Sequence, residues 1–462
     1  MGVVVDGKWS VGARNTLALM MLALLVGLVY LLEYAALPFV DGPLYDSLVY
    51  LEQARRVRLG QHADPTLLAF SPLYGYFLAL FGAHAHDMTV PVVQVVLGVL
   101  DLWLVGRVTT RLFGARAAPF AMAAMLLYGP LLFYQSKVLS ETVGLTLLLL
   151  AIDRLAGETP RAEAWGGLLL ALSVLARASL LVMLPLFVFE RLRLSWRRSL
   201  VLALAILAPL VGHGIYVKAR TGVFVPVILV SSTAATATRS DWTGELDTFR
   251  SKGEAHVGAF SVVDQARERL AHPEAPRPSV SWIGWLERAP MKALLTLRDE
   301  ETSFDYGWYG ERSELWTLRL LCVSFGLLAS WGVVGAWFAI RERRGALLVP
   351  VVLGIFAVTT LFHPSTRYRL PLVVALAPLA GLAWTRADRR LLAAIAVVFV
   401  VHGLGRALEH PGLWQLRVAE SAAVSGDAET CVRRLHRARE LEPCALVEAR
   451  AAYIATIMSS CR

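Results

Sequence analysis

Acidic side chains lie at the ends of apolar segments in this sequence, where they could act on a substrate at a membrane surface. Asp41 and Asp46 follow the first strongly apolar run, Thr16–Leu37, and Glu141 stands at the start of another, in Y-Q-S-K-V-L-S-E-T. A carboxylate costs roughly 3 kcal/mol inside a bilayer and little at its rim. A carboxylate at the rim can take a proton from an acceptor hydroxyl while cations hold a phosphate leaving group.

Arginines supply the cations that such chemistry needs. Arg367 and Arg369 lie in H-P-S-T-R-Y-R-L-P and do not fit the alternation of basic loops described below, and Arg177 stands alone between two apolar segments. The planar guanidinium suits phosphate oxygens. We expect Arg367 and Arg369 to bind phosphate, or else anionic lipid headgroups without specificity. Arg177 could line the same site or pair with Glu141 or Asp46.

Each acid also has a simpler interpretation. Asp46 could cap a helix over 47–59, and Asp41 precedes Gly-Pro, which indicates a turn. Glu141 has Lys137 one helical turn before it, so the two could form an ion pair at the interface. These alternatives stay open at the level of the sequence.

The region around Asp46 carries the most specific pattern. The segment Leu44–Gly60 has the apolar spacing of a helix that lies along the membrane interface. It contains D-x-x-x-Y-x-x-x-A-R-x-x-x-x-G, starting at Asp46 and including Tyr50, and S-P-L-Y-x-Y-F-L-x-L-F-G follows it. This stretch resembles the first extracytoplasmic loop of GT-C glycosyltransferases, particularly bacterial protein O-mannosyltransferases and lipid A aminoarabinose transferases.

The resemblance includes R-Y-R-L-P, a motif at an outer helix start in many bacterial GT-C proteins, and it departs at two places. The family often has Glu after the Asp, where this chain has Ser47, and Lys or Glu before the Pro-Leu, where it has Phe70-Ser71. The resemblance covers roughly the first 200 residues and the region 360–375.

The resemblance implies a function and a set of site residues. Membrane enzymes of this type transfer a sugar, with inversion at the sugar carbon, from a polyprenyl-phosphate donor to a protein, lipid or glycan acceptor outside the cytoplasm. Asp46 would be the general base, and Glu141 would orient the acceptor or ligate a divalent metal ion, if one is used. The remaining expected roles are donor phosphate binding by Arg367, Arg369 and Arg177, and acceptor or sugar contacts by Asp41, Tyr50, Glu300 and Glu301.

Glu300 and Glu301 belong to an acidic cluster that precedes the aromatic run F-D-Y-G-W-Y-G. Acids beside aromatic rings are common in sugar sites, because the rings pack on pyranose faces. Trp and Tyr also settle at membrane interfaces for physical reasons alone. The second interpretation is slightly favoured for this cluster.

Composition places the chain in a membrane. It has 462 residues, of which 56% are hydrophobic, and a mean hydropathy of +0.56, whereas soluble domains are near 45–50% apolar. About eleven segments are apolar enough to span, or nearly so. They are Thr16–Leu37, Met88–Val105, Ala117–Phe133, Val138–Leu155, Trp165–Leu175, Leu180–Phe189, Leu200–Val217, Leu315–Ile340, Ala346–Phe362, Leu370–Trp384 and Leu391–Leu404.

The loop charges predict an orientation. Along the chain, short basic links between apolar segments alternate with links that are less basic, and basic loops face the cytoplasm. The prediction is an all-α polytopic protein of the bacterial inner membrane, with a cytoplasmic N-terminus. Its transmembrane domain covers 1–404, and two outer loops, at 38–87 and 218–314, would lie outside the cytoplasm together with the active site and the C-terminus.

The tail, 405–462, turns polar. Gly-Asp between two helical patterns that end in Pro resembles one tetratricopeptide repeat. A single repeat cannot bury its own face well, so it would need the following helix or a protein partner. A helical hairpin that caps the membrane domain is an equally good interpretation.

Several functions are disfavoured by the sequence. It has no P-loop, G-x-S-x-G, H-E-x-x-H or G-x-G-x-x-G motif. The net charge of +9 lies mostly in the short basic links, so we interpret it as a topology signal and not as a nucleic-acid surface. The alternatives to a glycosyltransferase are a secondary transporter or lipid flippase, which would show internal repeats, and a non-catalytic GT-C-like scaffold.

Overall fold

The computed structural model describes residues 11–82, 87–229, 261–274, 282–299, 301, 306–362, 364–403 and 411–441, together with 448, 451, 452 and 454. These residues form helices, and no strand occurs among them. An all-helical chain agrees with the prediction, since a lipid environment requires backbone groups to be paired within each segment.

Among the described residues, five helical segments are long and apolar enough to cross a membrane, and the bent pair α6–α7 makes a sixth if it is one span. The pair bends by 60°, where Gly129-Pro130 begins α7 and proline removes a backbone donor. The segments are α1 (Val11–Tyr34), α5 (Thr89–Phe113), α6 (Ala118–Leu126) with α7 (Gly129–Gln135), α11 (Trp196–Thr221), α17 (Trp316–Leu320) with α18 (Phe325–Arg341), and α20 (Thr366–Thr385).

The other predicted spans also lie in helices, but these are shorter. The count of eleven spans therefore stays a prediction, while a multi-pass membrane protein is what the apolar helices indicate. The shorter helices are α8 (Glu141–Leu155), α9 (Pro160–Ala176), η2 (Ala178–Val182) with α10 (Met183–Leu192), η3 (Ala346–Leu348) with α19 (Val349–Leu361), and α21 (Arg389–Gly403).

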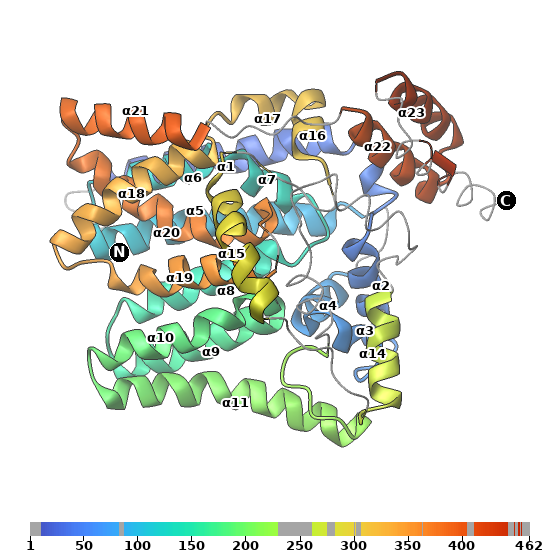
Figure 1. Ribbon diagram of the computed structural model, residues 1–462, viewed down its shortest axis with the longest axis horizontal. Helices are drawn as coiled ribbons and strands as arrows, with labels where there is room; N and C mark the ends of the chain where they lie inside the picture. Colours follow the sequence, from blue (N-terminus) through green and yellow to red (C-terminus); the bar gives the residue numbers. More distant parts are fainter. Residues whose placement is uncertain are drawn as a thin grey trace.

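The long helices run roughly side by side, and short helices gather at one end of the bundle (Figure 1). The segment predicted to be the first outer loop folds into short helices there, and α14 packs on α3. The short helices at this end are η1 (Pro38–Val40), α2 (Asp46–Arg58), α3 (Pro65–Ala69), α4 (Pro72–Leu80) and α14 (Ser261–Ala271). Helix α15 (Trp282–Leu297) crosses the middle of the view in Figure 1 and packs on α19, and α16 (Trp308–Glu314) contacts α22.

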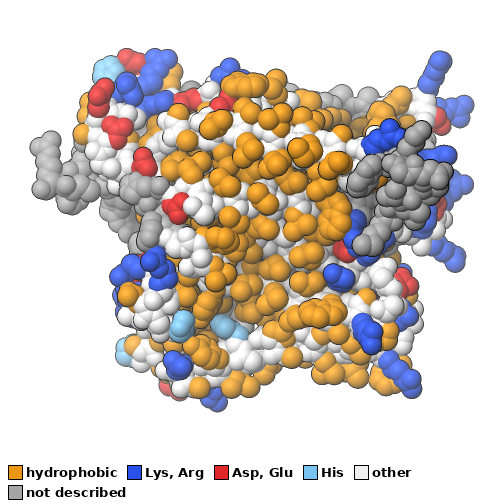
Figure 2. Space-filling view, turned by 180° about the vertical axis from the view of Figure 1, so that it is seen from behind, with side chains coloured by type: hydrophobic (Ala, Val, Ile, Leu, Met, Phe, Trp, Pro, Cys, Tyr) orange, Lys and Arg blue, Asp and Glu red, His pale blue; other side chains and the backbone are white. Residues whose placement is uncertain are grey.

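The surface of the bundle is strongly apolar. Figure 2 shows hydrophobic side chains gathered across the face opposite to that of Figure 1, with charged side chains mostly toward the edges. Helix α1 contributes Leu17, Met21 and Leu25, each about half exposed or more. Such a surface is stable against lipid chains and not against water.

The C-terminal helices α22 (Pro411–Ser425) and α23 (Ala428–Leu441) pack against each other as a hairpin. Their shared core includes Leu416, Ala419, Cys431 and Ile454. The hairpin lies at the same end of the molecule as α2 (Figure 1), and α22 contacts η1 and α16. Whether this unit is a tetratricopeptide repeat that binds a partner stays a prediction.

Candidate active site

Four elements bring charged side chains together at one point. Asp46 is the first residue of α2, Glu141 is the first residue of α8, and Arg367 lies in the first turn of α20. Arg177 lies at the break between α9 and η2. The sequence predicts each of them as a site residue, and the structure joins all four in one network.

Arg367 is the centre of this network. Its Nη1 donates to Oδ2 of Asp46 at 2.5 Å, and its Nε donates to Oε1 of Glu141. The same guanidinium therefore binds both carboxylates. Since these residues come from distant parts of the chain, the contact fixes α2, α8 and α20 relative to one another.

Arg177 completes the network from a second side. Its Nη1 forms an ion pair with Oε1 of Glu141, and its Nη2 donates to the backbone oxygen of Arg367 at 2.7 Å. The segment after Arg177 is held by Ser71, whose Oγ accepts from the backbone nitrogen of Ala178 at 2.9 Å. Ser71 is one of the positions at which the sequence departs from the family pattern, and here it supports the site.

Exposure identifies the open side of the cluster. The side chain of Asp46 is 24% exposed, whereas that of Arg367 is 10% and that of Glu141 is 3% exposed. A ligand can therefore reach Asp46 and the adjoining edge of the Arg367 guanidinium most readily. Glu141 and Arg177 lie behind them.

The helix ends add to the electrostatics of this point. The N-termini of α2, α8 and α20 meet here, because Asp46, Glu141 and Arg367 all lie in first turns. A helix N-terminus carries roughly half a positive charge and favours anions. The two carboxylates and two guanidiniums balance each other, so the three helix ends leave the cluster favourable to an added anion.

Arg369 belongs to a separate cluster. Its Nη2 donates to Oε2 of Glu301 at 2.6 Å, its Nη1 donates to the backbone oxygen of Arg298 at 2.7 Å, and its side chain is 2% exposed. Glu301 also accepts from the hydroxyls of Tyr128 and Thr366, each at 2.8 Å. These contacts attach the segment after α15 to the start of α20. Glu300 lies outside the described residues.

Of the other predicted contacts, Tyr50 lies beside the carboxylate pair. Asp41 is exposed at the end of η1. Tyr50 is 3% exposed, its ring meets those of Phe70 and Tyr74, and its hydroxyl donates to Oγ of Ser140 at 3.1 Å. Burial raises the pKa of Tyr50 well above its usual value, so the phenol stays protonated as a hydrogen-bond donor. It thereby holds Ser140, the residue before Glu141.

The ion pair between Lys137 and Glu141 that the sequence allows does not form. Lys137 Nζ instead binds Oε2 of Glu311 at 2.6 Å, with both side chains fully buried. Residues 138–140 are not helical, so the i−4 spacing does not bring Lys137 to Glu141. Figure 1 shows α16, which carries Glu311, close to α1 and α7.

The Lys137 ammonium also lies over aromatic rings, at 3.9 Å from the centre of Tyr34 and 5.1 Å from that of Tyr306. Burial lowers the pKa of Lys137 to about 8, although the Glu311 carboxylate opposes the shift. Burial likewise raises the pKa of Glu311. The pair thus ties the start of α8 to α16 at a cost in desolvation.

Tyr306 is a functional candidate that the sequence does not single out. Its hydroxyl accepts from the backbone nitrogen of Leu44 at 3.1 Å and shares a hydrogen bond with Oγ of Ser47 at 2.9 Å. It therefore holds the residues on both sides of Asp46. Ser47, the other departure from the family pattern, provides the attachment. The only available sequence signal is the aromatic run in which Tyr306 lies.

A divalent metal ion fits this arrangement poorly. Asp46 and Glu141 both bind Arg367, so the two carboxylates that could ligate an ion already share a cation. Within the described ranges, no group of three or more His, Cys, Asp or Glu side chains is placed to hold a metal. We derive no step that uses one.

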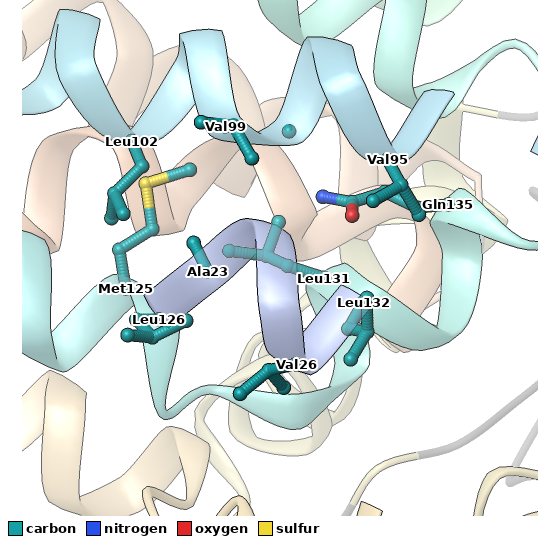
Figure 3. A pocket seen from close by; sticks show the side chains of 11 residues that line it. Ala23, Val26, Val95, Val99, Leu102, Met125, Leu126, Leu131, Leu132 and Gln135 are labelled. Carbon is teal, nitrogen blue, oxygen red and sulfur yellow. The ribbon is translucent and has the colours of Figure 1, made fainter. Parts of the chain in front are cut away.

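An apolar recess lies elsewhere, between α1, α5, α6 and α7 (Figure 3). Its cavity volume is about 40 Å³. Its walls are aliphatic or sulfur-bearing side chains such as Val26, Val95 and Met125, and Gln135 is the polar side chain among its lining residues. Its lining residues carry no charge, in contrast to the Asp46 cluster.

Neither a protein-family model nor a curated protein matches the sequence. Among solved structures, the chain is similar to ArnT from Cupriavidus metallidurans. The form bound to undecaprenyl phosphate has 14% identity and a TM-score of 0.45, and the match covers 96% of this chain and 75% of that one. The apo form has 15% identity, a TM-score of 0.48 and coverages of 97% and 76%.

A second similar structure is the archaeal oligosaccharyltransferase AglB from Archaeoglobus fulgidus, in complex with an inhibitory peptide and a dolichol-phosphate. It has 15% identity and a TM-score of 0.46, and the match covers 95% of this chain but 56% of that one. The similarity is distant, so the residues of the site carry the proposal that follows.

Proposed function

We propose that this chain is a membrane glycosyltransferase of GT-C type that uses a polyprenyl-phosphate sugar as donor. The observation that carries the proposal is the convergence of Asp46, Glu141, Arg177 and Arg367 at three helix N-termini. A base beside an anion-binding arginine is what transfer from a sugar phosphate requires. The motif around Asp46 supports the same chemistry.

In the proposed reaction, the oxygen of an acceptor hydroxyl attacks the anomeric carbon of the donor sugar. The bond between that carbon and the phosphate oxygen breaks, and the phosphate leaves with the electron pair. The carboxylate of Asp46 takes the proton of the hydroxyl. Arg367 holds the phosphate through its planar fork, and the helix N-termini stabilise the charge that develops on it.

The ion pair between Arg367 and Asp46 links donor binding to the base. A donor phosphate that binds the exposed edge of Arg367 competes with Asp46 for the guanidinium. Asp46 is then released from its cation and becomes a better proton acceptor. Arg177 and Glu141 keep Arg367 in place during this exchange, because Arg177 binds both Glu141 and the backbone of Arg367.

Arg369 has a supporting role in this proposal. Its fork is occupied by Glu301 and the backbone oxygen of Arg298, so it fixes the start of α20 and not the donor. The acceptor is a protein, lipid or glycan outside the cytoplasm. The active site and the C-terminus are on that side of the bacterial inner membrane, and the N-terminus is cytoplasmic.

The test is transfer of labelled sugar from a set of polyprenyl-phosphate sugars into a membrane extract by purified protein. We expect wild-type protein to transfer from one donor, and Asp46→Asn to lose about 10²- to 10⁴-fold in rate, as expected for a general base. Glu52→Gln is the matched control, because Glu52 lies on the same helix and pairs with Arg55 at the surface. Absence of transfer from every donor would instead favour a scaffold or a transporter.

A further inference from the structure

The C-terminal hairpin contacts the turn that leads into Asp46. Oγ of Ser421, on α22, donates to the backbone oxygen of Gly42 at 2.6 Å, and both residues are buried. The two backbones are so close that a Cβ on Gly42 would lie 1.9 Å from the backbone oxygen of Ser421. A side chain at position 42 would therefore force α22 away from the turn.

The same turn contains an uncommon backbone conformation. Tyr45 has φ 49° and ψ −119° and directly precedes Asp46. For a residue other than glycine, such a conformation costs of order 1–3 kcal/mol and persists only where the surroundings enforce it. Tyr306 holds Leu44 on one side. On the other side the Tyr45 hydroxyl reaches Oε2 of Glu420, next to Ser421, at a rather long 3.3 Å.

Helix α22 is anchored independently of this turn. The ring of Trp414 meets that of Phe39 with 5.5 Å between centres, and its Nε1 donates to Glu314 of α16 at 2.9 Å. Arg434 of α23 binds the same Glu314 at 2.6 Å. The hairpin therefore packs on both η1 and α16, and these contacts fix α22 beside the turn at 42–46.

We infer that α22 is a positioning element of the active site, in which Ser421 and Glu420 set the conformation of residues 42–46. The place of the Asp46 carboxylate relative to Arg367 depends on that conformation. Ser421 and Glu420 touch neither donor nor acceptor in this scheme and act through the turn. The inference rests on the proposed function, and it gives the polar tail a role within the enzyme itself.

The first experiment uses the full chain with Ser421→Ala. We expect kcat to fall about 10- to 100-fold, as a displacement near 1 Å can cause, while KM for the donor does not rise, because a displaced Asp46 competes no more strongly for Arg367. Hydrogen exchange at the backbone of 42–46 should become faster. The control is Arg433→Gln, since Arg433 is 64% exposed on α23, and it should change neither quantity.

Further variants test how α22 holds the same turn without removing the serine. Gly42→Ala should displace α22 and lower kcat at least as much as Ser421→Ala. Tyr45→Phe and Glu420→Gln should each lower kcat, and the double variant should be no worse than either, because both remove one interaction.

The experiments distinguish a failure of the positioning role from a failure of the proposed function. Wild-type kcat and unchanged exchange in both Ser421→Ala and Gly42→Ala would overturn the positioning role. If the wild-type chain transfers no sugar, the proposed function fails, and the exchange measurement, which needs no activity, still decides whether α22 holds the turn. A Gly42→Ala protein that does not fold would leave Ser421→Ala to decide.

Discussion

Arg367 and Asp46 are 321 positions apart in the chain, and a 2.5 Å hydrogen bond joins Nη1 of one to Oδ2 of the other. The arginine comes from the start of a long apolar helix, and the aspartate from the first loop between apolar segments. The contact places the proposed phosphate ligand against the proposed base. Neither group can change its charge or position without affecting the other.

Arg367→Lys should weaken donor binding. Lysine keeps the charge but lacks the planar fork, so it cannot bind Asp46, Glu141 and a phosphate in the same way. One lost hydrogen bond to a charged group is worth about 1.5–3 kcal/mol, which corresponds to about tenfold or more in donor Kd. Titration of each protein with polyprenyl phosphate measures this Kd. Arg386→Lys, an exposed pair with Glu342, is the control, and equal affinities in all three proteins would exclude Arg367 as the phosphate ligand.

Gly144→Ala should disturb the site by displacing Arg177. A Cβ on Gly144 would lie 2.9 Å from Cβ of Arg177, so the arginine would be pushed away from Glu141. We expect a loss of about tenfold or more in transfer rate. Gly212→Ala is the matched control, because nothing lies within 4 Å of a Cβ there. If both variants have wild-type rates, Arg177 does not need its present position.

Lys137→Met should lower stability more than the double variant Lys137→Met/Glu311→Gln. The single change leaves Glu311 buried without its cation, which costs about 3–5 kcal/mol, whereas removing both charges is far less costly. Thermal unfolding in detergent, with light scattering to detect aggregation, measures which of the two variants is less stable. A double variant less stable than the single one would contradict this account of the pair.

The buried pair of Lys137 and Glu311 makes the free energy of unfolding depend on pH. The pKa of Lys137 is lowered from 10.5 to about 8 in the folded protein, so between about pH 8 and pH 10.5 the unfolded chain binds more protons there than the folded one. The contribution of Lys137 to the free energy of unfolding therefore rises with pH in that window. The melting temperature of wild type minus that of Lys137→Met should increase from pH 8 to pH 10. A constant or falling difference would mean that the Lys137 pKa is not lowered.

Much of the fold could be predicted because lipid restricts the choices. In the part of the chain that the structure describes, each segment expected to span consists mostly of helix, and the amphipathic pattern from Leu44 correctly predicts helix α2. The bend between α6 and α7 was not predicted, since Gly129-Pro130 lies within a continuous apolar run. Hydropathy alone does not distinguish a straight span from a bent one.

The site could be predicted in part. The sequence singles out Asp46 chiefly through its resemblance to the GT-C loop, and Glu141 as an ionisable residue at the mouth of an apolar helix. It singles out Arg367 because this arginine does not fit the alternation of basic loops, and Arg177 because it stands alone between two apolar segments. Their neighbours in space were not foreseeable. The sequence suggests Lys137 as the partner of Glu141 by spacing, whereas the three residues before α8 are not helical and Lys137 turns to Glu311. Tyr306 and Ser421 act through long-range contacts that local sequence patterns do not reveal.

The measurement that tests the central claim most directly follows donor binding and sugar transfer in the same preparation of Asp46→Asn. The account predicts that this variant binds the polyprenyl-phosphate sugar as tightly as wild type, or more tightly, since Arg367 no longer holds a carboxylate at position 46. It also predicts that the bound donor stays intact, with transfer reduced about 10²- to 10⁴-fold. Transfer at the wild-type rate by Asp46→Asn would contradict the account.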